Sequence, residues 1–368
     1  MHDAKPLLAN ILSLAQSETW QRRELSDEHI RAWLNSNRRD VTRVYLVGCG
    51  TSLYAGQVGK YILENLMRVP AEAIPSFAFA TYVESALLSP HTLVVGISAT
   101  GNTQATVYAL AKAKDAGAMT LALTGDAASG VTQKADATIL VPGALNVSIK
   151  TRSYVQTLVA LYLLALRLAE AHQKISTDGV DHWKEQIKRA ADASRRFLED
   201  QRAQIKQLAE HYAEASNVFV LGSGPNTGTA EEASLKIIEM AKMYSDSQGL
   251  ENFLHGRLRE VDRTTPVFFV APHGPSSQRV LDFLTVTDYV GAPSVVLTDQ
   301  ISSGMRRLAS HIVQLPGGLD ELATPLLYIT PLYLFAYHLA HHRGYDPKSR
   351  RYPDIVPQNV RYGDVLDA

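Results

Sequence analysis

A nine-residue stretch that occurs twice decides the fold of this chain. VYLVGCGTS spans Val44–Ser52, and VFVLGSGPN spans Val218–Asn226, which begins 174 residues later. In both copies a short apolar run ends in a glycine-rich turn, a pattern typical of a buried parallel strand followed by a helix. Three more strand-like runs follow in each half, in the same order and at the same offset. They begin at Leu93 and Val267, at Ala118 and Ala292, and at Ala137 and His311.

The constant offset indicates that one folding unit is present twice, because unrelated strands would give scattered offsets. Strands that alternate with helical patterns favour a parallel sheet. The sequence therefore predicts an α/β fold of two tandem doubly wound domains, joined by a charged, helix-favouring connector. The expected segments are an N-terminal helical segment (1–35), a first domain (36–172), the connector (173–207), a second domain (208–343) and an irregular C-terminal arm (344–368).

The composition is that of a globular protein without a strongly charged partner. Apolar residues make up 46% and charged residues 20% of the chain, and 36 basic residues nearly balance 37 acidic ones. This balance argues against nucleic acid or an anionic membrane as a partner. The longest apolar stretch, Leu158–Leu166, is too short to cross a bilayer and predicts a buried helix.

The single cysteine, Cys49, indicates a reducing cytoplasm, and no secretory signal is recognisable. We expect no metal and no other cofactor, because neither Cys49 nor the AHH run at Ala340–His342 belongs to a plausible ligand set.

Hydroxyl side chains cluster after two strands of the first half. One cluster is GCGTS, Gly48–Ser52, and the other is SATGNT, Ser98–Thr103. In a parallel sheet such turns lie at the carboxyl edge beside helix N-termini, where anions bind. Neither turn has the lysine of a nucleoside-triphosphate loop or the acidic partner of a dinucleotide fingerprint. A small phosphate ester is therefore the expected ligand.

Helix capping is the alternative role for these hydroxyls. A single cap accounts for one hydroxyl, but three are present, at Ser98, Thr100 and Thr103. The aligned loop of the second half, Pro272–Ser276, follows an equivalent strand and lacks the cluster. We therefore favour phosphate binding over capping.

Two candidate catalytic residues occur in the second half alone. Glu239 and His255 align with Asn65 and Thr81 of the first half. A carboxylate and an imidazole are common groups for moving protons in enzymes. Purely structural roles are also compatible with the sequence, since Glu239 could pair with a lysine one turn away and His255 could be a turn residue.

The motifs GCGTS, SATGNT and EEASLKIIE with NFLHG together resemble those of the sugar isomerase (SIS) domain family, over roughly residues 35–362. The resemblance is to its two-domain members, namely the isomerase half of the glucosamine-6-phosphate synthases and the fructosamine-6-phosphate deglycases. It implies two flavodoxin-like SIS domains and a small phosphorylated sugar as substrate. The residues implied to bind the phosphate are Ser52, Ser98, Thr100 and Thr103.

The same resemblance implies roles for Glu239 and His255. Glu239 corresponds to the glutamate that moves a proton between C1 and C2, and His255 to the histidine that opens the sugar ring. In relatives this histidine comes from the neighbouring subunit, so we expect a homodimer with its active site at or near the subunit interface. The further residues implied to line the substrate are Gly50, Thr51, Ala99, Gly101, Asn102, Lys150, Thr151, Arg152 and Asn252.

Several positions depart from the family pattern. Ala99 replaces the usual glutamine of the synthases, and Arg257 replaces the proline of the HGP motif. The lysine that forms a Schiff base in the synthases aligns with Ile355, and no lysine follows Lys348. We therefore favour deglycase-like chemistry. The alternative is an isomerase of the glutamine–fructose-6-phosphate aminotransferase type without its glutaminase domain, which we expect not to release ammonia from glutamine.

A non-catalytic phosphosugar sensor is a third possibility, because SIS domains also occur fused to DNA-binding modules. The first 35 residues are too few for a helix-turn-helix module, and the net charge of −1 provides no basic arm. The presence of both Glu239 and His255 also favours an enzyme.

Overall fold

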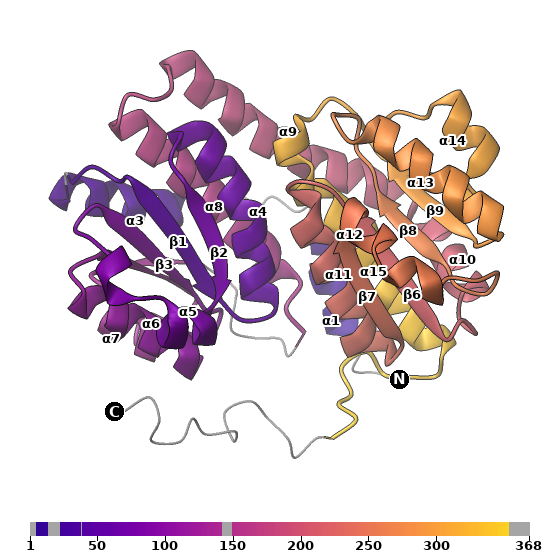
Figure 1. The fold of residues 1–368 in the computed structure, drawn as a ribbon, viewed down its shortest axis with the longest axis horizontal. Coiled ribbons are helices and arrows are strands. Elements are labelled where there is room, and N and C mark those ends of the chain that lie inside the picture. The colour runs from indigo at the N-terminus through magenta and orange to yellow at the C-terminus, as the bar shows by residue number, and fades with distance from the viewer. Residues whose placement is uncertain (1–4, 14–22, 38, 142–148, 353–368) are drawn as a thin grey trace. The chain divides into compact units, whose positions relative to one another are not determined.

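The computed structural model describes residues 5–13, 23–37, 39–141 and 149–352. The chain divides into two compact units. The first unit comprises residues 17–184 and 350–368, and the second comprises residues 1–16 and 185–349. In Figure 1 the sheet of the first unit is indigo to purple and that of the second is red to orange. Each unit is described by itself below.

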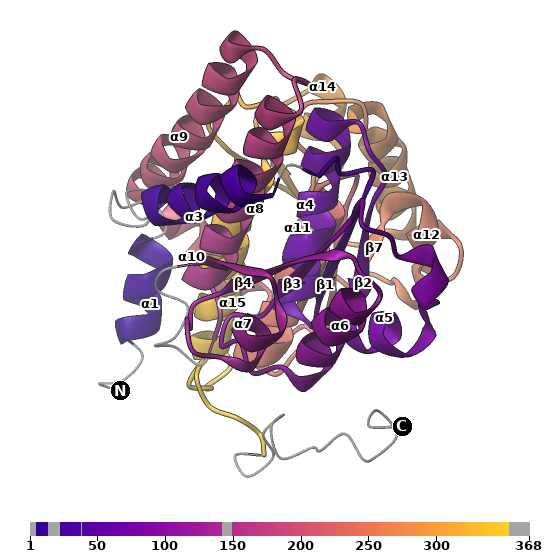
Figure 2. The ribbon, with the colours of Figure 1, turned by 90° about the vertical axis from the view of Figure 1, so that its left-hand side faces the viewer.

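The sheet of the first unit has five parallel strands in the order β2-β1-β3-β4-β5. Figure 2 shows β4, β3, β1 and β2 side by side in that order. The central strands β3 and β4 are fully buried, which explains their continuous apolar sequences. The strands are β1 (Arg43–Gly48), β2 (Ala71–Pro75), β3 (Thr92–Ile97), β4 (Met119–Thr124) and β5 (Ala137–Leu140).

Helices cover both faces of this sheet. On one face Phe79, Ala109 and Leu110 pack against Tyr45, Val94 and other strand residues. The other face carries a pair of long helices, α4 and α8, with α3 packed on α8. The helices are α3 (Arg23–Ser36), α4 (Thr51–Met67), α5 (Ser76–Tyr82), α6 (Gln104–Asp115), α7 (Gly130–Lys134) and α8 (Arg152–Ala171), with a short 3-10 turn η2 (Ser85–Leu87).

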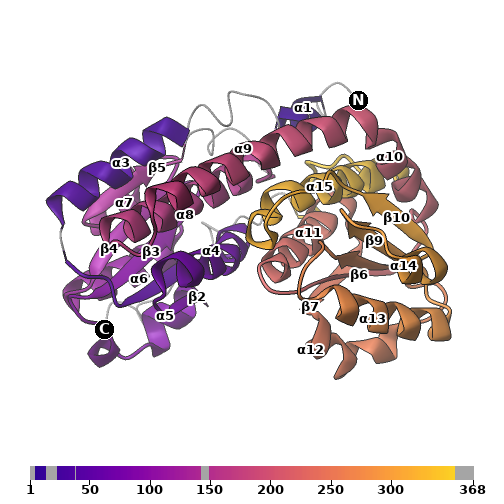
Figure 3. The ribbon, with the colours of Figure 1, turned by 90° about the horizontal axis from the view of Figure 1, so that it is seen from above.

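The second unit repeats this architecture with the order β7-β6-β8-β9-β10, again all parallel. Figure 3 shows α11 and α15 on one face of the sheet, and α12 and α13 on the other. The strands are β6 (Asn217–Gly222), β7 (Tyr244–Gly249), β8 (Val267–Val270), β9 (Ser294–Thr298) and β10 (His311–Gln314). The helices are α1 (Lys5–Leu12), α10 (Arg202–His211), α11 (Asn226–Ala241), α12 (Leu250–Leu254), α13 (Ser277–Val290), α14 (Ser303–Leu308) and α15 (Pro325–His342), with 3-10 turns η3 (Arg257–Glu260) and η4 (Glu321–Ala323).

The structure therefore confirms two tandem α/β domains with the same strand order, joined through the 24-residue helix α9 (Thr177–Asp200). It adds a fifth strand to each half, because β2 and β7 were not among the four expected strand pairs. By length and composition α8 could cross a membrane, but 89% of its apolar window is buried inside the protein.

The N-terminal helical segment differs from the expectation of a helix outside the first domain. Helix α3 packs against α8 and β5 of the first unit, where Ile30 and Trp33 are buried. Arg167 of α8 makes two hydrogen bonds to the carboxylate of Asp27, at 2.7 and 2.9 Å. In contrast α1 contacts α15 of the second unit. The buried apolar side and this ion pair explain why α3 belongs to the domain.

Candidate functional site

The strand order of the first unit indicates where a ligand is expected to bind. In the order β2-β1-β3-β4-β5 the chain leaves β1 toward one side and β3 toward the other, and ligands of such folds bind where these two directions diverge. Val47 of β1 pairs with Gly96 of β3. The loops that follow these strands therefore open at the same edge, and they are GCGTS and SATGNT.

Two of the expected phosphate ligands are in contact. The Oγ of Ser98 and the Oγ1 of Thr103 lie 2.9 Å apart, and Ser98 is buried whereas Thr100 is exposed. Thr103 is the N-cap residue of α6, but its side chain makes no capping hydrogen bond. Capping thus does not account for the hydroxyl of Thr103.

The SATGNT loop is held in place by the first residues of α7. Gly101 has a φ of +72°, and its carbonyl accepts a hydrogen bond from the amide of Val131 at 2.9 Å. The Oδ1 of Asn102 accepts a hydrogen bond from the amide of Gly130 at 3.1 Å. A Cβ at position 101 would lie 1.9 Å from the Oγ of Ser129. Glycine is therefore required here both by the backbone conformation and by the close approach.

Helices of the first unit begin at this edge, α4, α6 and α8 among them, and such N-termini favour an anion. Helix α4 starts at Thr51 after Gly50, which has a φ of +53°. Helix α8 starts at Arg152. The Oγ1 of Thr151 and the Nε of Arg152 are buried and have no hydrogen-bond partner among the described residues. These unsatisfied polar atoms are consistent with a place for a polar ligand.

The second unit holds Glu239 in a buried ionic cluster on α11. The ammonium of Lys236 lies 2.8 Å from the carboxylate of Glu239 and 3.3 Å from that of Glu232. The hydroxyl of Tyr333, from α15, donates a hydrogen bond to Glu232 at 2.8 Å. Lys236 and Glu232 have fully buried side chains, whereas the side chain of Glu239 is 36% exposed. The carboxylate of Glu239 is thus the one partly exposed charged group of the cluster, and the buried Lys236 and Glu232 lie beneath it.

The charges of this cluster outweigh the cost of burying Lys236. Burial alone lowers the pKa of a lysine, but the carboxylates of Glu232 and Glu239 raise the pKa of Lys236 above its usual value. Lys236 therefore remains cationic. Lys242 also donates a hydrogen bond to the carbonyl of Glu239. The lysine pairing that the sequence left open is present, and it fixes the position of the Glu239 carboxylate.

Comparison of the two units shows that the fold does not require this cluster. At the equivalent positions of the first unit, Glu232, Lys236 and Tyr333 are replaced by apolar residues, all of them buried. These residues are Val58, Ile62 and Val159. Sequence reasoning missed Glu232, Lys236 and Tyr333 as a set, although this difference between aligned halves was a signal that could have found them.

His255 follows the short helix α12 and is exposed. Two ion pairs fasten its segment to the rest of the second unit. Arg279 of α13 binds the carboxylate of Glu251 at 2.5 and 2.9 Å, and Arg257 binds Asp246 of β7 at 2.9 Å. Arg257, which replaces the proline of the family motif, thus has a structural partner. Asn252, also expected near the substrate, is exposed on α12.

Carboxylates surround the aligned loop of the second unit, Pro272–Ser276. Asp299 accepts hydrogen bonds from the amide of His273 at 2.8 Å and from the hydroxyl of Tyr328 at 3.0 Å. A Cβ on Gly274 would lie 2.7 Å from Glu321, and burial raises the pKa of Glu321. These carboxylates disfavour a phosphate. The loops Ser98–Thr103 and Pro272–Ser276 therefore differ in the charge of their surroundings as well as in sequence.

The structure does not bring the expected residues together into one site within a unit. Glu239 and His255 lie on different faces of the second sheet, and the phosphate loop belongs to the first unit. Ser52, Ala99 and Lys150 lie at or beside the carboxyl edge of the first sheet, and Ile355 lies outside the described residues. Among the described residues, no group of three or more histidine, cysteine or acidic residues could hold a metal ion.

The sequence of this chain matches a known protein family. The chain matches the model of the SIS domain over residues 39–167 and again over 211–343. The isomerizing glutamine–fructose-6-phosphate aminotransferase of Methanothermobacter thermautotrophicus is 29% identical over 309 residues, which cover 84% of this chain and 50% of that protein. The enzyme of the same name from Caldanaerobacter subterraneus is 28% identical over 307 residues, which cover 83% and 50%. The chain spans about half the length of these curated relatives.

Solved structures share the fold. The C-terminal domain of glucosamine-fructose-6-phosphate aminotransferase from Francisella tularensis superposes with a TM-score of 0.80 at 21% identity, covering 91% of this chain and 98% of that one. Glucosamine-6-phosphate deaminase from Thermotoga maritima superposes with a TM-score of 0.69 at 20% identity, covering 94% and 99%. At these identities the likeness concerns the fold alone.

Proposed function

The chain belongs to the SIS domain family, and from this premise we propose that it is an enzyme that acts on the 6-phosphate of an amino sugar or ketosamine. The observation that carries the proposal is the asymmetry between its two domains. The first unit has the hydroxyl-rich loop with Ser98 in contact with Thr103. The second has a partly exposed carboxylate, Glu239, on a buried ionic cluster. Binding and proton transfer are thus divided between the two copies.

The substrate phosphate binds at Ser52, Ser98, Thr100 and Thr103 in this proposal. The hydroxyls and the N-termini of α4 and α6 stabilise its negative charge. This anchor lies away from the reacting carbons, so its binding energy serves to position C1 and C2.

Glu239 moves the proton between C1 and C2. A general base must be ionised and have access to the substrate. The ammonium of Lys236 holds the carboxylate of Glu239 at 2.8 Å, and the partly exposed side chain of Glu239 provides the access. His255 transfers a proton to the ring oxygen and so opens the sugar ring. The remaining expected lining residues, including Lys150, Thr151 and Arg152, surround the sugar near its phosphate.

The reaction is either isomerisation or loss of the amine. The curated relatives are named as isomerizing aminotransferases, which favours proton transfer between aldose and ketose forms. A solved relative of the same fold is named as a glucosamine-6-phosphate deaminase. We retain deglycase-like chemistry as the preferred variant, because Ile355 stands at the place of the Schiff-base lysine. The isomerase without a glutaminase domain and the phosphosugar sensor remain the alternatives.

The protein acts as a cytoplasmic homodimer in this proposal. His255 is exposed on a segment that the Glu251–Arg279 and Arg257–Asp246 ion pairs hold in shape. A rigid, exposed segment can enter the site of a second copy. The symmetric dimer then contains two equivalent sites, each completed by its partner.

The test is to assay wild-type protein and Glu239→Gln on fructose 6-phosphate, glucosamine 6-phosphate and several ketosamine 6-phosphates. We expect turnover of at least one substrate by the wild type, and a loss of about 100-fold or more in kcat for Glu239→Gln, as is usual when a general base is removed. Glu210→Gln, on the exposed side of α10, serves as the control. Undiminished turnover by Glu239→Gln contradicts the role of Glu239, and absence of turnover on the whole panel favours the sensor.

A further inference from the structure

The first unit contains a cavity of about 610 Å³ that the proposed function does not use. It lies between the C-terminal ends of α3 and α6 and the beginnings of β4 and β5, and its lining includes Trp33, Lys114 and Ala137. Because the strands are parallel, their beginnings lie at the amino edge of the sheet. The phosphate loop follows the end of β3, at the opposite edge. The cavity is therefore separate from the proposed substrate site.

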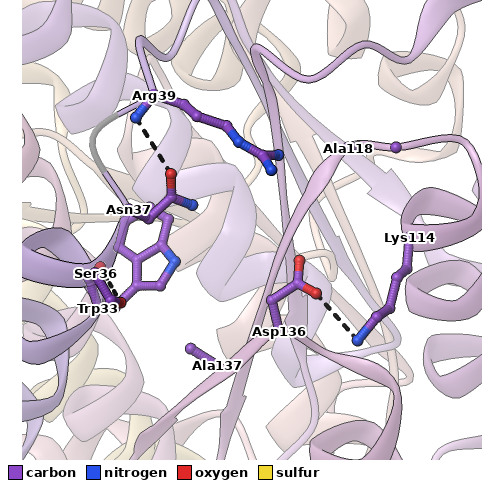
Figure 4. Close-up of a pocket in the computed structure, with 9 residues that line it drawn as sticks. Trp33, Ser36, Asn37, Arg39, Lys114, Ala118, Asp136 and Ala137 are labelled. Carbon is purple, nitrogen blue, oxygen red and sulfur yellow. Dashed lines mark hydrogen bonds and ion pairs between the residues drawn. The ribbon is translucent and has the colours of Figure 1, made fainter.

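Hydrogen-bond donors without partners gather at this cavity. The side chain of Trp33 is 95% buried, and its Nε1 has no hydrogen-bond partner in the described part of the protein. Arg39 is an exposed residue of the lining, and its guanidinium makes no hydrogen bond or ion pair with any residue that the structure describes. Figure 4 shows this guanidinium and the indole nitrogen on the sides that face Asp136. The buried N–H of Trp33 costs free energy while it lacks a partner, and a bound acceptor would remove that cost.

The charges that line the cavity favour an anion. The ammonium of Lys114 lies 3.0 Å from Asp136, and the other carboxylate oxygen of Asp136 accepts hydrogen bonds from the amide and hydroxyl of Thr120. Asp136 is thus satisfied within the protein, and Arg39 supplies the charge that remains. An arginine can bind a carboxylate or a phosphate with two parallel hydrogen bonds.

The second unit shows that the fold alone does not produce this cavity. The position equivalent to Ala137 is His311, and the position equivalent to Asn37 is His211. In the second unit the rings of His211 and His311 lie 5.3 Å apart, with Tyr212 packed against both at 4.7 and 5.8 Å. Three rings in edge-to-face contact occupy these positions. The first unit has a methyl group and an amide at the two positions, which leaves the space open.

We propose that this cavity binds a small organic anion through a carboxylate or phosphate group, with Arg39 as the main charged contact and the Nε1 of Trp33 as a second donor. The ligand is monoanionic or dianionic, because one unpaired cation faces the cavity in the part of the chain that the structure describes. Its binding does not depend on catalysis, since the two sites lie at opposite edges of the sheet.

The experiment follows the indole N–H signals of the three tryptophans by ¹⁵N–¹H NMR of the full chain. The signal of Trp33 is assigned from its absence in Trp33→Phe. Titrations with inorganic phosphate and with succinate distinguish the two anion chemistries. We expect the Trp33 signal to shift and saturate with at least one of them, and the affinity to fall about tenfold or more in Arg39→Ala. Absence of a saturable shift with both anions overturns the proposal.

Three further variants show whether the anion binds in this cavity or elsewhere on the protein. Asp136→Asn removes a negative charge, so we expect tighter anion binding. Arg68→Ala removes an exposed arginine outside the lining, and we expect unchanged affinity. Ser98→Ala weakens the phosphate loop, and we expect the Trp33 titration to stay as in the wild type. If Arg68→Ala weakens binding as much as Arg39→Ala, or if Ser98→Ala abolishes the shift, the cavity is not the binding site.

Discussion

Glu239 and His255 lie on opposite faces of the second sheet. Glu239 is near the end of α11, which packs against α15. His255 follows α12, whose Phe253 packs with Phe283 of α13. Figure 3 shows α11 and α15 on one face of the sheet and α12 and α13 on the other. No hydrogen bond or ion pair joins the two residues in the described structure. If both act on one substrate, the sheet of their own unit stands between them, and the simplest arrangement takes His255 from a second copy.

Complementation between two inactive variants tests this arrangement. Glu239→Gln and His255→Ala are expected to be inactive alone. When the two are mixed and allowed to exchange subunits, half of the dimers are mixed, and each mixed dimer has one intact site. We therefore expect recovery of about a quarter of the wild-type activity. If native mass spectrometry shows that mixed dimers have formed and no activity returns, each site is built from a single chain.

The phosphate loop and its sister loop provide a matched pair of substitutions. Ser98→Ala with Thr103→Val removes two hydroxyls from the proposed phosphate site, so KM should rise about 10- to 100-fold, as expected for lost hydrogen bonds to a charged group. Ser277→Ala changes the residue aligned with Thr103 in the second unit and should leave KM unchanged. Steady-state kinetics on the active substrate measures both. A similar rise in KM for Ser277→Ala would argue against phosphate binding by the first loop.

Gly101 tests how tightly the loop is held. Gly101→Ala places a Cβ against Ser129 and forces alanine into the left-handed region, so we expect a loss of about 2–4 kcal/mol in the free energy of unfolding. Gly117 has a φ of +83° and open space around it. Gly117→Ala should therefore cost less, since only the backbone term applies. Ser129→Gly added to Gly101→Ala should recover part of the loss in denaturant unfolding, and absence of recovery would contradict the steric clash.

Removing one charge from the buried cluster of the second unit should lower the free energy of unfolding strongly, whereas replacing the whole cluster by apolar residues should lower it little. Lys236→Met leaves Glu232 buried without its counter-ion and should lower the free energy of unfolding by about 3–5 kcal/mol. Replacing all three residues by those of the first unit, with Glu232→Val, Lys236→Ile and Tyr333→Val, should restore most of that stability. The triple variant should nevertheless lose activity, because Glu239 loses its cationic neighbour. Full activity in the triple variant would show that Glu239 does not depend on the cluster.

The stability of the second unit should decrease in mild acid. Burial lowers the pKa of His338 to about 4, and the nearby His341, Lys206 and His342 act in the same direction. The unfolded state, with an ordinary histidine, then binds more protons than the folded state below pH 6.5. Stability is therefore lost as the pH falls from about 6.5 toward 4. His338→Gln should flatten this part of the thermal-denaturation profile, whereas the exposed His273→Gln should not.

The sequence predicted four strands of each sheet, including the edge strands β5 and β10, and missed β2 and β7 at the other edge. Strands such as Leu93–Ile97 are buried on both faces and therefore apolar throughout. β2 and β7 carry AEAIP and YSDSQG, and all but one residue of each strand is partly or fully exposed, so no apolar run marks them. The place of α3 was also misjudged, because its contact with the domain depends on Asp27 and Arg167, which lie far apart in sequence.

The candidate site was predictable in its residues and not in its arrangement. The hydroxyls of Ser98 and Thr103 were expected to act together, and they are in contact. Their role and those of Glu239 and His255 stay predictions. The support of Glu239 by Lys236 and Glu232 could not be read from spacing, because i to i+3 and i to i+4 pairs occur on any helix surface. Lys236 and Glu232 are buried only because of how the helices and the sheet pack together, which the spacing of residues does not reveal.

The apolar counterparts of the buried cluster have a consequence for how this protein can change. Val58, Ile62 and Val159 show that the same scaffold accepts a hydrocarbon interior at these positions. In a laboratory evolution experiment that selects for thermal resistance alone, the second unit should therefore acquire the apolar residues of the first unit. The ionised groups of the buried cluster should be lost first. Selection for both thermal resistance and enzymatic turnover should retain these ionised groups. Comparison of the two halves thus indicates how much stability is lost by keeping the buried ionised groups that the proposed activity needs.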